Sequence, residues 1–108
     1  MAPVFFERKT TMQIKLNIDG KEKTFDTGKQ TADAVFKAAE FEDDWKKITT
    51  SLGRLKAMTA QVVEMYGNQF TEQDIRDGLG AEEFGPVMLY QCFGVGEKVT
   101  ELSTVKND

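Results

Sequence analysis

Residues 12–26 read MQIKLNIDGKEKTFD, and this stretch decides how the chain begins to fold. From Met12 to Ile18, apolar and polar residues alternate strictly, which is the period of a half-buried β-strand. Asp19-Gly20 follows at once and supplies the positive φ angles of a two-residue type I′ turn. Such a turn pairs Ile18 with Lys21, Leu16 with Lys23 and Ile14 with Phe25. We therefore predict a β-hairpin over about 12–26, whose apolar face must pack on other elements, since a lone hairpin is only marginally stable.

After the hairpin, the sequence changes to helical periodicity. Apolar residues recur at i, i+3, i+4 and i+7, namely Ala32, Val35, Phe36 and Ala39. Thr31 or Thr27 is the expected N-cap of this helix. The acidic stretch EFEDD at 40–44 favours a break, with Asp43 or Asp44 capping a new helix, and the alternative is a solvated helix edge.

The longest predicted element is a helix over 45–66. Its larger residues are spaced three and four apart in a heptad seam, namely Trp45, Ile48, Leu52, Leu55, Thr59, Val62 and Tyr66. Such a stripe usually packs in the protein's own core, and the alternative is packing against a helix of a partner. Gly53 lies inside the pattern and indicates a kink or a close helix crossing, because glycine weakens a helix by about 1 kcal/mol relative to alanine.

The C-terminal third carries signals for two more helices. Gly67-Asn68 suits a left-handed helix end. Thr71 begins TEQD, which is close to a capping box, before a short helix that stops at Gly78. A last, strongly apolar helix starts at Ala81 or at Pro86, because proline is accepted in a first helical turn.

These elements predict an α+β fold in which the N-terminal β-hairpin packs against a small, mainly helical domain of three to four helices. Residues 12–94 form this single domain. We expect residues 1–11 to be a flexible N-terminal arm, on which Phe5 and Phe6 are candidates for docking on a neighbour. We expect residues 95–108 to be a loose C-terminal tail, because few apolar residues remain there to bury.

The composition excludes several classes of function. The chain has 108 residues, enough for one core, and a formal net charge of −4, which argues against nucleic-acid binding because phosphate contacts need clustered Lys and Arg. It contains no His and one Cys, so His-based catalytic triads, His-containing zinc sites and intrachain disulfides are excluded. Its apolar runs are too short to span a membrane and it lacks a signal-peptide pattern, so we expect a cytoplasmic location.

The sequence holds no credible catalytic, cofactor or metal site. The carboxylates at 40–44 lack the ligand spacing of an EF-hand and are expected to be solvated. Cys92 lies in an apolar helix, where a buried, inert thiol is expected. We therefore predict a protein that is not an enzyme and binds no cofactor. The 8 Phe and 5 Met either fill the core or form an adaptable surface for an apolar, helical partner.

Two motifs resemble those of tail assembly chaperones from siphophages, the long-tailed bacteriophages, of Gram-positive hosts. The first is IKLNIDGKEKTF at 14–25, and the second is VVEMYGNQFTEQDIRDGL at 62–79, where Tyr66 stands in place of the usual Phe. With the intervening helical region, the resemblance covers about residues 12–93. The segments at both ends lie outside it, so no role is inferred for them.

The resemblance implies a chaperone that binds the tape measure protein, keeps it soluble and helps to recruit subunits of the tail tube protein. It implies action in the cytoplasm of the infected bacterium and absence from the mature virion. A frameshifted longer form of the chain is a further implied partner, and self-association into a homo-oligomer is a further expectation. Neither a nucleic acid nor a membrane is an expected partner.

The residues expected to face the partner are large apolar side chains, namely Trp45, Leu52, Phe70, Phe84, Tyr90 and Phe93. For each of them the alternative is a place in the core. The alternative function is a permanent structural component of the phage tail or head–tail junction, which would self-associate symmetrically and remain in virions. A small regulator that binds one host protein is a third hypothesis.

Overall fold

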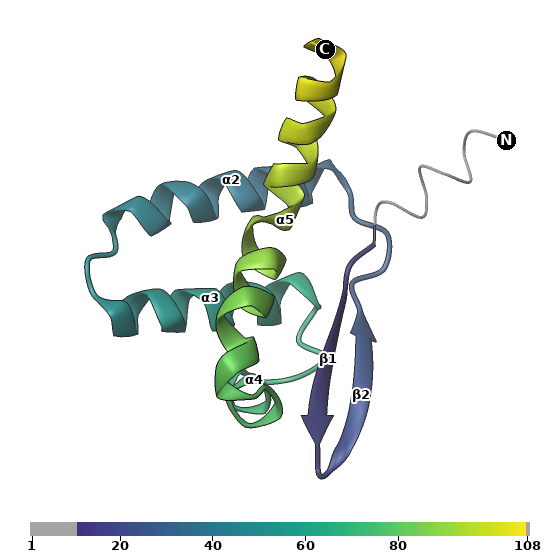
Figure 1. Ribbon diagram of the computed structural model, residues 1–108, viewed down its shortest axis with the longest axis vertical. Helices are drawn as coiled ribbons and strands as arrows, with labels where there is room; N and C mark the ends of the chain where they lie inside the picture. The colour runs from purple at the N-terminus through teal and green to yellow at the C-terminus, as the bar shows by residue number, and fades with distance from the viewer. Residues whose placement is uncertain (1–10, 108) are drawn as a thin grey trace, which may run out of the picture.

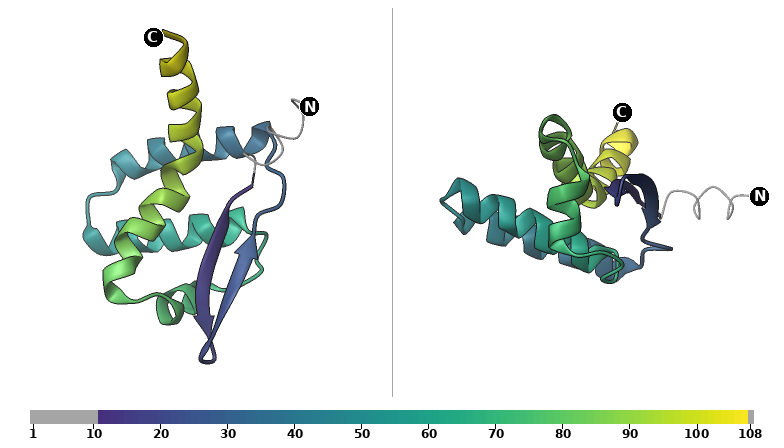
Figure 2. Two further views of the ribbon diagram at one scale, coloured as in Figure 1. Left: turned by 45° about the vertical axis from the view of Figure 1, so that its right-hand side comes forward. Right: turned by 90° about the horizontal axis from the view of Figure 1, so that it is seen from below.

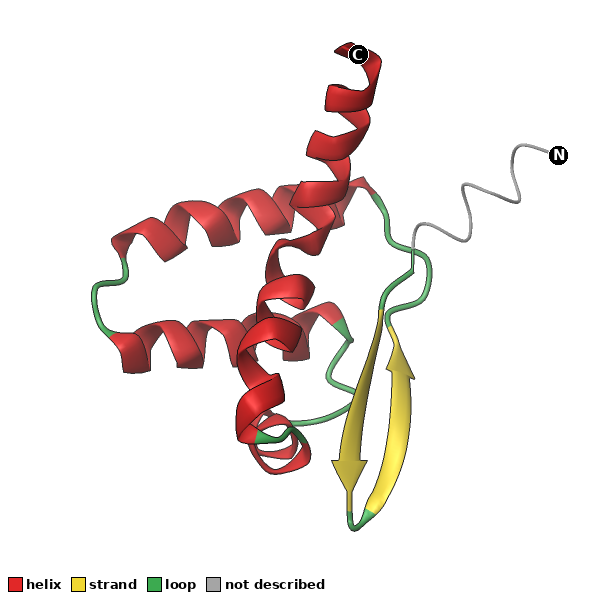
Figure 3. Ribbon diagram, in the orientation of Figure 1, coloured by secondary structure: helices red, strands yellow, loops and turns green. Residues whose placement is uncertain are grey.

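The computed structural model describes the backbone of residues 11–107, and the side chains of residues 11–94, as an antiparallel β-hairpin and four helices (Figure 1). The elements are β1 (Gln13–Ile18), β2 (Lys21–Asp26), α2 (Ala32–Lys47), α3 (Ser51–Met65), α4 (Glu72–Gly78) and α5 (Ala81–Asn107). Helices α2 and α3 form one layer and α5 lies across it, with the hairpin beside α5 (Figures 2 and 3). The predicted α+β fold is confirmed.

The hairpin has the predicted register and turn. The strands pair Ile14 with Phe25, Leu16 with Lys23 and Ile18 with Lys21. Asp19 and Gly20 have φ angles of 54° and 81°, as a type I′ turn requires. Met12, Ile14 and Leu16 are buried on the inner face. The alternating pattern therefore identified the correct face of β1.

The predicted break at Asp43 or Asp44 is wrong, because α2 runs without interruption from Ala32 to Lys47. The stretch at 40–44 contains neither glycine nor proline, and its four carboxylates are exposed, so nothing there forces the helix to end. The buried side of α2 is formed by Ala38, Phe41 and the half-buried Trp45. The apolar stripe that predicted this helix is instead almost entirely exposed, with Phe36 at 68%.

Helix α3 begins at Ser51, so the predicted helix 45–66 is in fact the end of α2, a connection at 48–50, and α3. Thr50 is the N-cap of α3, and its hydroxyl oxygen accepts a 3.0 Å hydrogen bond from the backbone N–H of Gly53. A Cβ atom at Gly53 would lie 2.7 Å from that oxygen. Gly53 therefore makes room for the cap, and marks neither a kink nor a helix crossing.

The predicted boundaries of α4 are confirmed. Gly67 and Asn68 have φ angles of 64° and 62° after the end of α3. Thr71 and Asp74 form a reciprocal capping box, with hydrogen bonds of 3.0 and 2.9 Å, and α4 ends at Gly78.

Of the two predicted starts of α5, the structure has Ala81. The carboxylate of Glu83 accepts a 3.2 Å hydrogen bond from the backbone N–H of Gly80, which is one half of a capping box at that position. Pro86 therefore lies inside the helix, where it lacks a backbone N–H.

The backbone of α5 continues as a helix to Asn107, whereas the sequence predicts a loose tail from residue 95 (Figure 1). This segment contains Glu, Lys and Leu, residues of high helix propensity, which favour a helix even where little apolar surface is available to bury. Residues 1–10, including Phe5 and Phe6, lie outside the described residues. The proposed domain limits at 11 and 94 therefore remain predictions.

The outer edge of β1 is covered by α5. The backbone N–H of Thr27 donates to the carbonyl oxygen of Met12 at 3.0 Å, so in the alternating antiparallel pattern the carbonyl of Gln13 points away from β2. The side-chain amide of Gln91 donates to this carbonyl oxygen at 2.7 Å. Its own Oε1 atom accepts a 2.7 Å hydrogen bond from the Tyr66 hydroxyl. Because Gln91 is 3% exposed, this chain of hydrogen bonds joins β1, α5 and the end of α3 through a buried side chain.

The same edge of β1 is approached by the end of α4. A Cβ atom at Gly78 would lie 3.0 Å from the carbonyl oxygen of Asn17 and 3.1 Å from its nitrogen. At Gly78 the backbone of α4 thus lies so close to β1 that an added Cβ atom would be crowded. Together, α4 and α5 cover an edge that would otherwise be open to pairing with another strand.

The close approach of Gly78 predicts that Gly78→Ala lowers the free energy of unfolding by about 1–3 kcal/mol, because the added methyl group overpacks the contact with Asn17. Gly85→Ala is the matched control, since a Cβ atom there meets nothing within 4 Å. We expect this control to be neutral or stabilising by up to about 1 kcal/mol. Urea unfolding of both variants measures the difference, and equal effects would contradict the close contact.

The burial of Tyr66 predicts a loss of stability in alkali. Burial raises the pKa of its hydroxyl well above the ordinary 10.0. The folded state therefore retains a proton that the unfolded state releases, so this contribution is complete below about pH 10 and is lost as the pH rises above it. Urea midpoints measured from neutral pH to about pH 11 should fall more steeply for the wild type than for Tyr66→Phe. Parallel curves would show that Tyr66 ionisation does not contribute.

Candidate functional site

Among the side chains predicted to face a partner, Phe70 lies in the core. It is 4% exposed, and its ring packs edge-on against Phe25 with 4.9 Å between centroids. The centroid of the Tyr66 ring lies 5.3 Å from that of Phe70. Phe70 therefore attaches the loop before α4 to the hairpin, and its burial leaves it no direct contact with a partner in this conformation.

Trp45 and Phe93 hold α2 to α5. Their rings meet edge-to-face with 5.5 Å between centroids, and Phe41 completes the cluster at 5.7 and 5.4 Å. The guanidinium carbon of Arg54 lies 4.9 Å from the centre of the Trp45 ring, in cation–π contact. Trp45 and Phe93 are both half-buried, so their main contribution is to the packing between helices. Tyr90, also on α5, is 50% exposed.

Leu52 and Phe84 line one groove. This hollow, here called the α3–α4–α5 groove, has a volume of about 830 Å³ and lies between α3, α4 and the start of α5. Leu52 and Leu55 are 60% and 43% exposed, which is unusual for leucines one turn apart on a helix. The apolar lining consists of Leu52, Leu55, Leu79, Ala81 and Phe84.

The polar lining of the groove carries both signs of charge, and consists of Lys56, Thr59, Glu72, Gln73 and Arg76. The buried hydroxyl of Thr59 lies 2.9 Å from the carbonyl oxygen of Lys56 and 3.2 Å from the carboxylate of Glu72. This hydroxyl thereby ties α3 to the first turn of α4. The groove therefore lies beside two helices joined by a hydrogen bond, and its apolar lining is mainly aliphatic.

Eight residues that line the groove were absent from the predicted set of partner-facing residues, namely Leu55, Lys56, Thr59, Glu72, Gln73, Arg76, Leu79 and Ala81. Leu55 had a signal, because it belongs to the same heptad seam as Leu52. Lys56 and Arg76 had none, since their positions beside the leucines depend on how α3 and α4 pack. Most of the aromatic residues predicted to face a partner are instead buried in the core or packed against it, namely Phe70, Trp45, Phe84 and Phe93.

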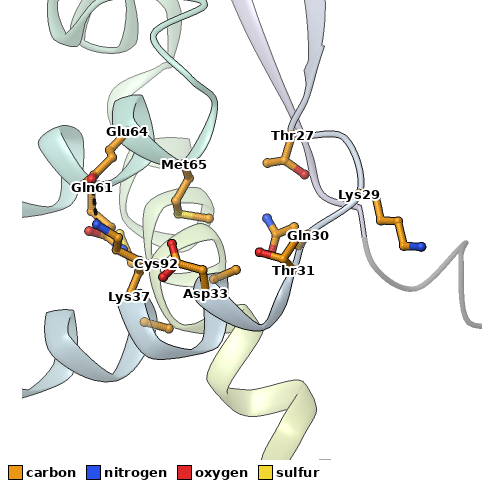
Figure 4. Close-up of a pocket in the computed structure, with 12 residues that line it drawn as sticks. Thr27, Lys29, Gln30, Thr31, Asp33, Lys37, Gln61, Glu64, Met65 and Cys92 are labelled. Carbon is orange, nitrogen blue, oxygen red and sulfur yellow. Dashed lines mark hydrogen bonds and ion pairs between the residues drawn. The ribbon is translucent and has the colours of Figure 1, made fainter.

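A second hollow of about 400 Å³ lies between α2, α3 and residues 27–31 (Figure 4). Its lining is mainly polar and includes an ion pair of 3.4 Å between Lys37 and Glu64. Cys92 also lines it, but burial raises the pKa of the thiol to about 12. The predicted buried thiol is confirmed, and a thiol with this pKa is a poor nucleophile near neutral pH.

The part of the chain that the structure describes holds no cluster of three or more His, Cys, Asp or Glu residues arranged to bind a metal ion. The carboxylates of residues 40–44 are all exposed along α2. None of the helices in the described residues combines the length and the apolar character needed to cross a membrane.

The chain is similar to one known protein family. Residues 9–108 match the family model described as phage tail chaperone protein. Comparisons with curated proteins and with solved structures give no significant match.

The contrast between Phe70 and Leu52 predicts opposite effects on stability. Phe70→Ala should lower the free energy of unfolding by about 3 kcal/mol or more, because it leaves a cavity in the core. Leu52→Ser should change it by no more than about 0.5 kcal/mol, because the side chain is exposed. Urea unfolding followed by the fluorescence of Trp45 measures both. If Leu52→Ser proved as costly as Phe70→Ala, Leu52 would belong to the core.

Proposed function

The chain belongs to the phage tail chaperone protein family, and on this premise we propose that it binds the tape measure protein during tail assembly. Binding keeps the tape measure protein soluble and helps to recruit subunits of the tail tube protein. The protein acts without catalysis in the cytoplasm of the infected bacterium and leaves before the virion is complete. A frameshifted longer form of the chain and a homo-oligomer are further assembly partners under this proposal.

The observation that carries the proposal is the exposure of Leu52 and Leu55 in the α3–α4–α5 groove. Each buried square ångström of apolar surface is worth roughly 25 cal/mol, so leucines left in water favour binding to another apolar surface. The two leucines lie one turn apart on α3, which is the spacing that receives side chains from a partner helix. A tape measure protein, long, helical and apolar, supplies such helices.

The charge of the chain supports the same role. A net charge of −4 on a chain of 108 residues gives each bound copy a repulsive surface toward other copies. Several copies along one tape measure protein would therefore cover apolar helices and keep the complexes apart. Coverage and repulsion together explain how a small acidic protein keeps a long apolar one in solution.

Co-expression with the tape measure protein of the same phage tests the proposal. We expect soluble tape measure protein, co-purifying with the chain, only when the chain is present. A Leu52→Asp/Leu55→Asp variant should lose this effect, because charged groups replace the two exposed leucines that line the groove. Val35→Asp/Phe36→Asp is the matched control, since these exposed apolar residues lie on α2 outside the groove, and it should retain the effect.

The outcomes separate the alternatives. Insoluble tape measure protein in the presence of the wild-type chain would remove the chaperone proposal. If both double variants still kept the tape measure protein soluble, the groove would be excluded as the binding site, but the chaperone function would remain supported. Mass spectrometry of purified virions provides the second readout, because a permanent component of the tail or head–tail junction would be found there and a chaperone would not.

A further inference from the structure

The α3–α4–α5 groove carries an uneven set of charges. Lys56 and Arg76 contribute two positive charges to its lining, against the single carboxylate of Glu72. That carboxylate lies 3.2 Å from the Thr59 hydroxyl and in the first turn of α4, so it is already engaged within the protein. The one ion pair found within the described residues joins Lys37 and Glu64, outside the groove.

This local excess of positive charge stands against the acidic character of the whole chain. With a net charge of −4, most of the surface disfavours a negatively charged partner. The two cations come from different helices, Lys56 from α3 and Arg76 from α4, and both line the groove together with Leu52 and Leu55. The groove therefore combines two exposed leucines with a positively charged side chain from each of two helices.

We propose that this groove binds an amphipathic helix whose apolar stripe is flanked by Asp or Glu side chains. The apolar stripe covers Leu52 and Leu55, and the flanking carboxylates lie beside Lys56 and Arg76. The inference rests on the proposed function and deepens it, because it states which segments of a partner the groove selects. A helix with Lys or Arg beside the same stripe is disfavoured by like charges.

Two synthetic helical peptides test the charge preference directly. They share one leucine stripe and differ only in their flanking residues, which are Glu in one and Lys in the other. The full chain should bind the Glu peptide about fivefold more tightly at low salt, as expected for two solvent-exposed ion pairs. This preference should shrink as the salt concentration rises, because exposed charges are screened. Fluorescence anisotropy of labelled peptides measures both affinities.

A charge reversal provides the matched comparison. Lys56→Glu/Arg76→Glu should reverse the order of the two peptides. Lys15→Glu/Lys29→Glu makes the same change in net charge at two exposed lysines outside the groove, and should preserve the order. Thermal unfolding of each variant establishes that the fold is intact before affinities are compared.

Equal affinities for the two peptides, preference for the Lys peptide, or no binding of either would overturn the inference. Persistence of the wild-type order in the Lys56→Glu/Arg76→Glu variant would do the same. These results are independent of the co-expression experiment. If the tape measure protein were solubilised but the chain showed no peptide preference, the chaperone function would stand without this inference. If the chain preferred the Glu peptide but did not solubilise the tape measure protein, only the charge preference of the groove would be supported.

Discussion

The hydrogen bond from the Gln91 side chain to the carbonyl oxygen of Gln13 connects the last helix to the first strand at 2.7 Å. An isolated hairpin is marginal in water, and its outer edge exposes backbone groups that need partners. Gln91 satisfies one of these groups while its own carbonyl accepts from Tyr66. Since the pair is buried, losing either partner would leave a polar group without water or protein to bind it. The packing of α5 on β1 therefore depends on this hydrogen bond, and the close approach of Gly78 to Asn17 places α4 on the same edge.

The groove follows from the same arrangement. Helix α4 is held at its start by its capping box and at its end by the contact of Gly78 with β1, so its length and position are set. The hydrogen bonds that join α3 and the residue after it to α4 and α5 involve Met58, Thr59 and Tyr66. The first turns of α3 are therefore flanked by neighbours without being covered, and Leu52 and Leu55 stay exposed. Helix α3 is thus hydrogen-bonded to its neighbours in its second half, and exposes two leucines near its start.

Different parts of the structure were predictable to different degrees. The hairpin register and the start of α4 were correct because each depends on residues within a few positions of one another. The break at 40–44 was wrong, since acidic residues do not end a helix whose buried side continues through Phe41 and Trp45. The set of partner-facing residues remains a prediction, and composition did not indicate which of its members are buried. Phe70 became a core residue, whereas Leu52 remained on the surface.

By itself, the sequence determined the local structure: the alternation of β1, the Asp19-Gly20 turn, the capping box of α4 and the absence of histidine chemistry. Only the tertiary structure decided which side of α2 is buried and which leucines of α3 remain in water. The physical reason is that turns and caps are set by steric and hydrogen-bonding demands between near neighbours. Burial instead depends on the total apolar area that distant segments can cover together, and an amphipathic helix alone does not specify which neighbours will cover it.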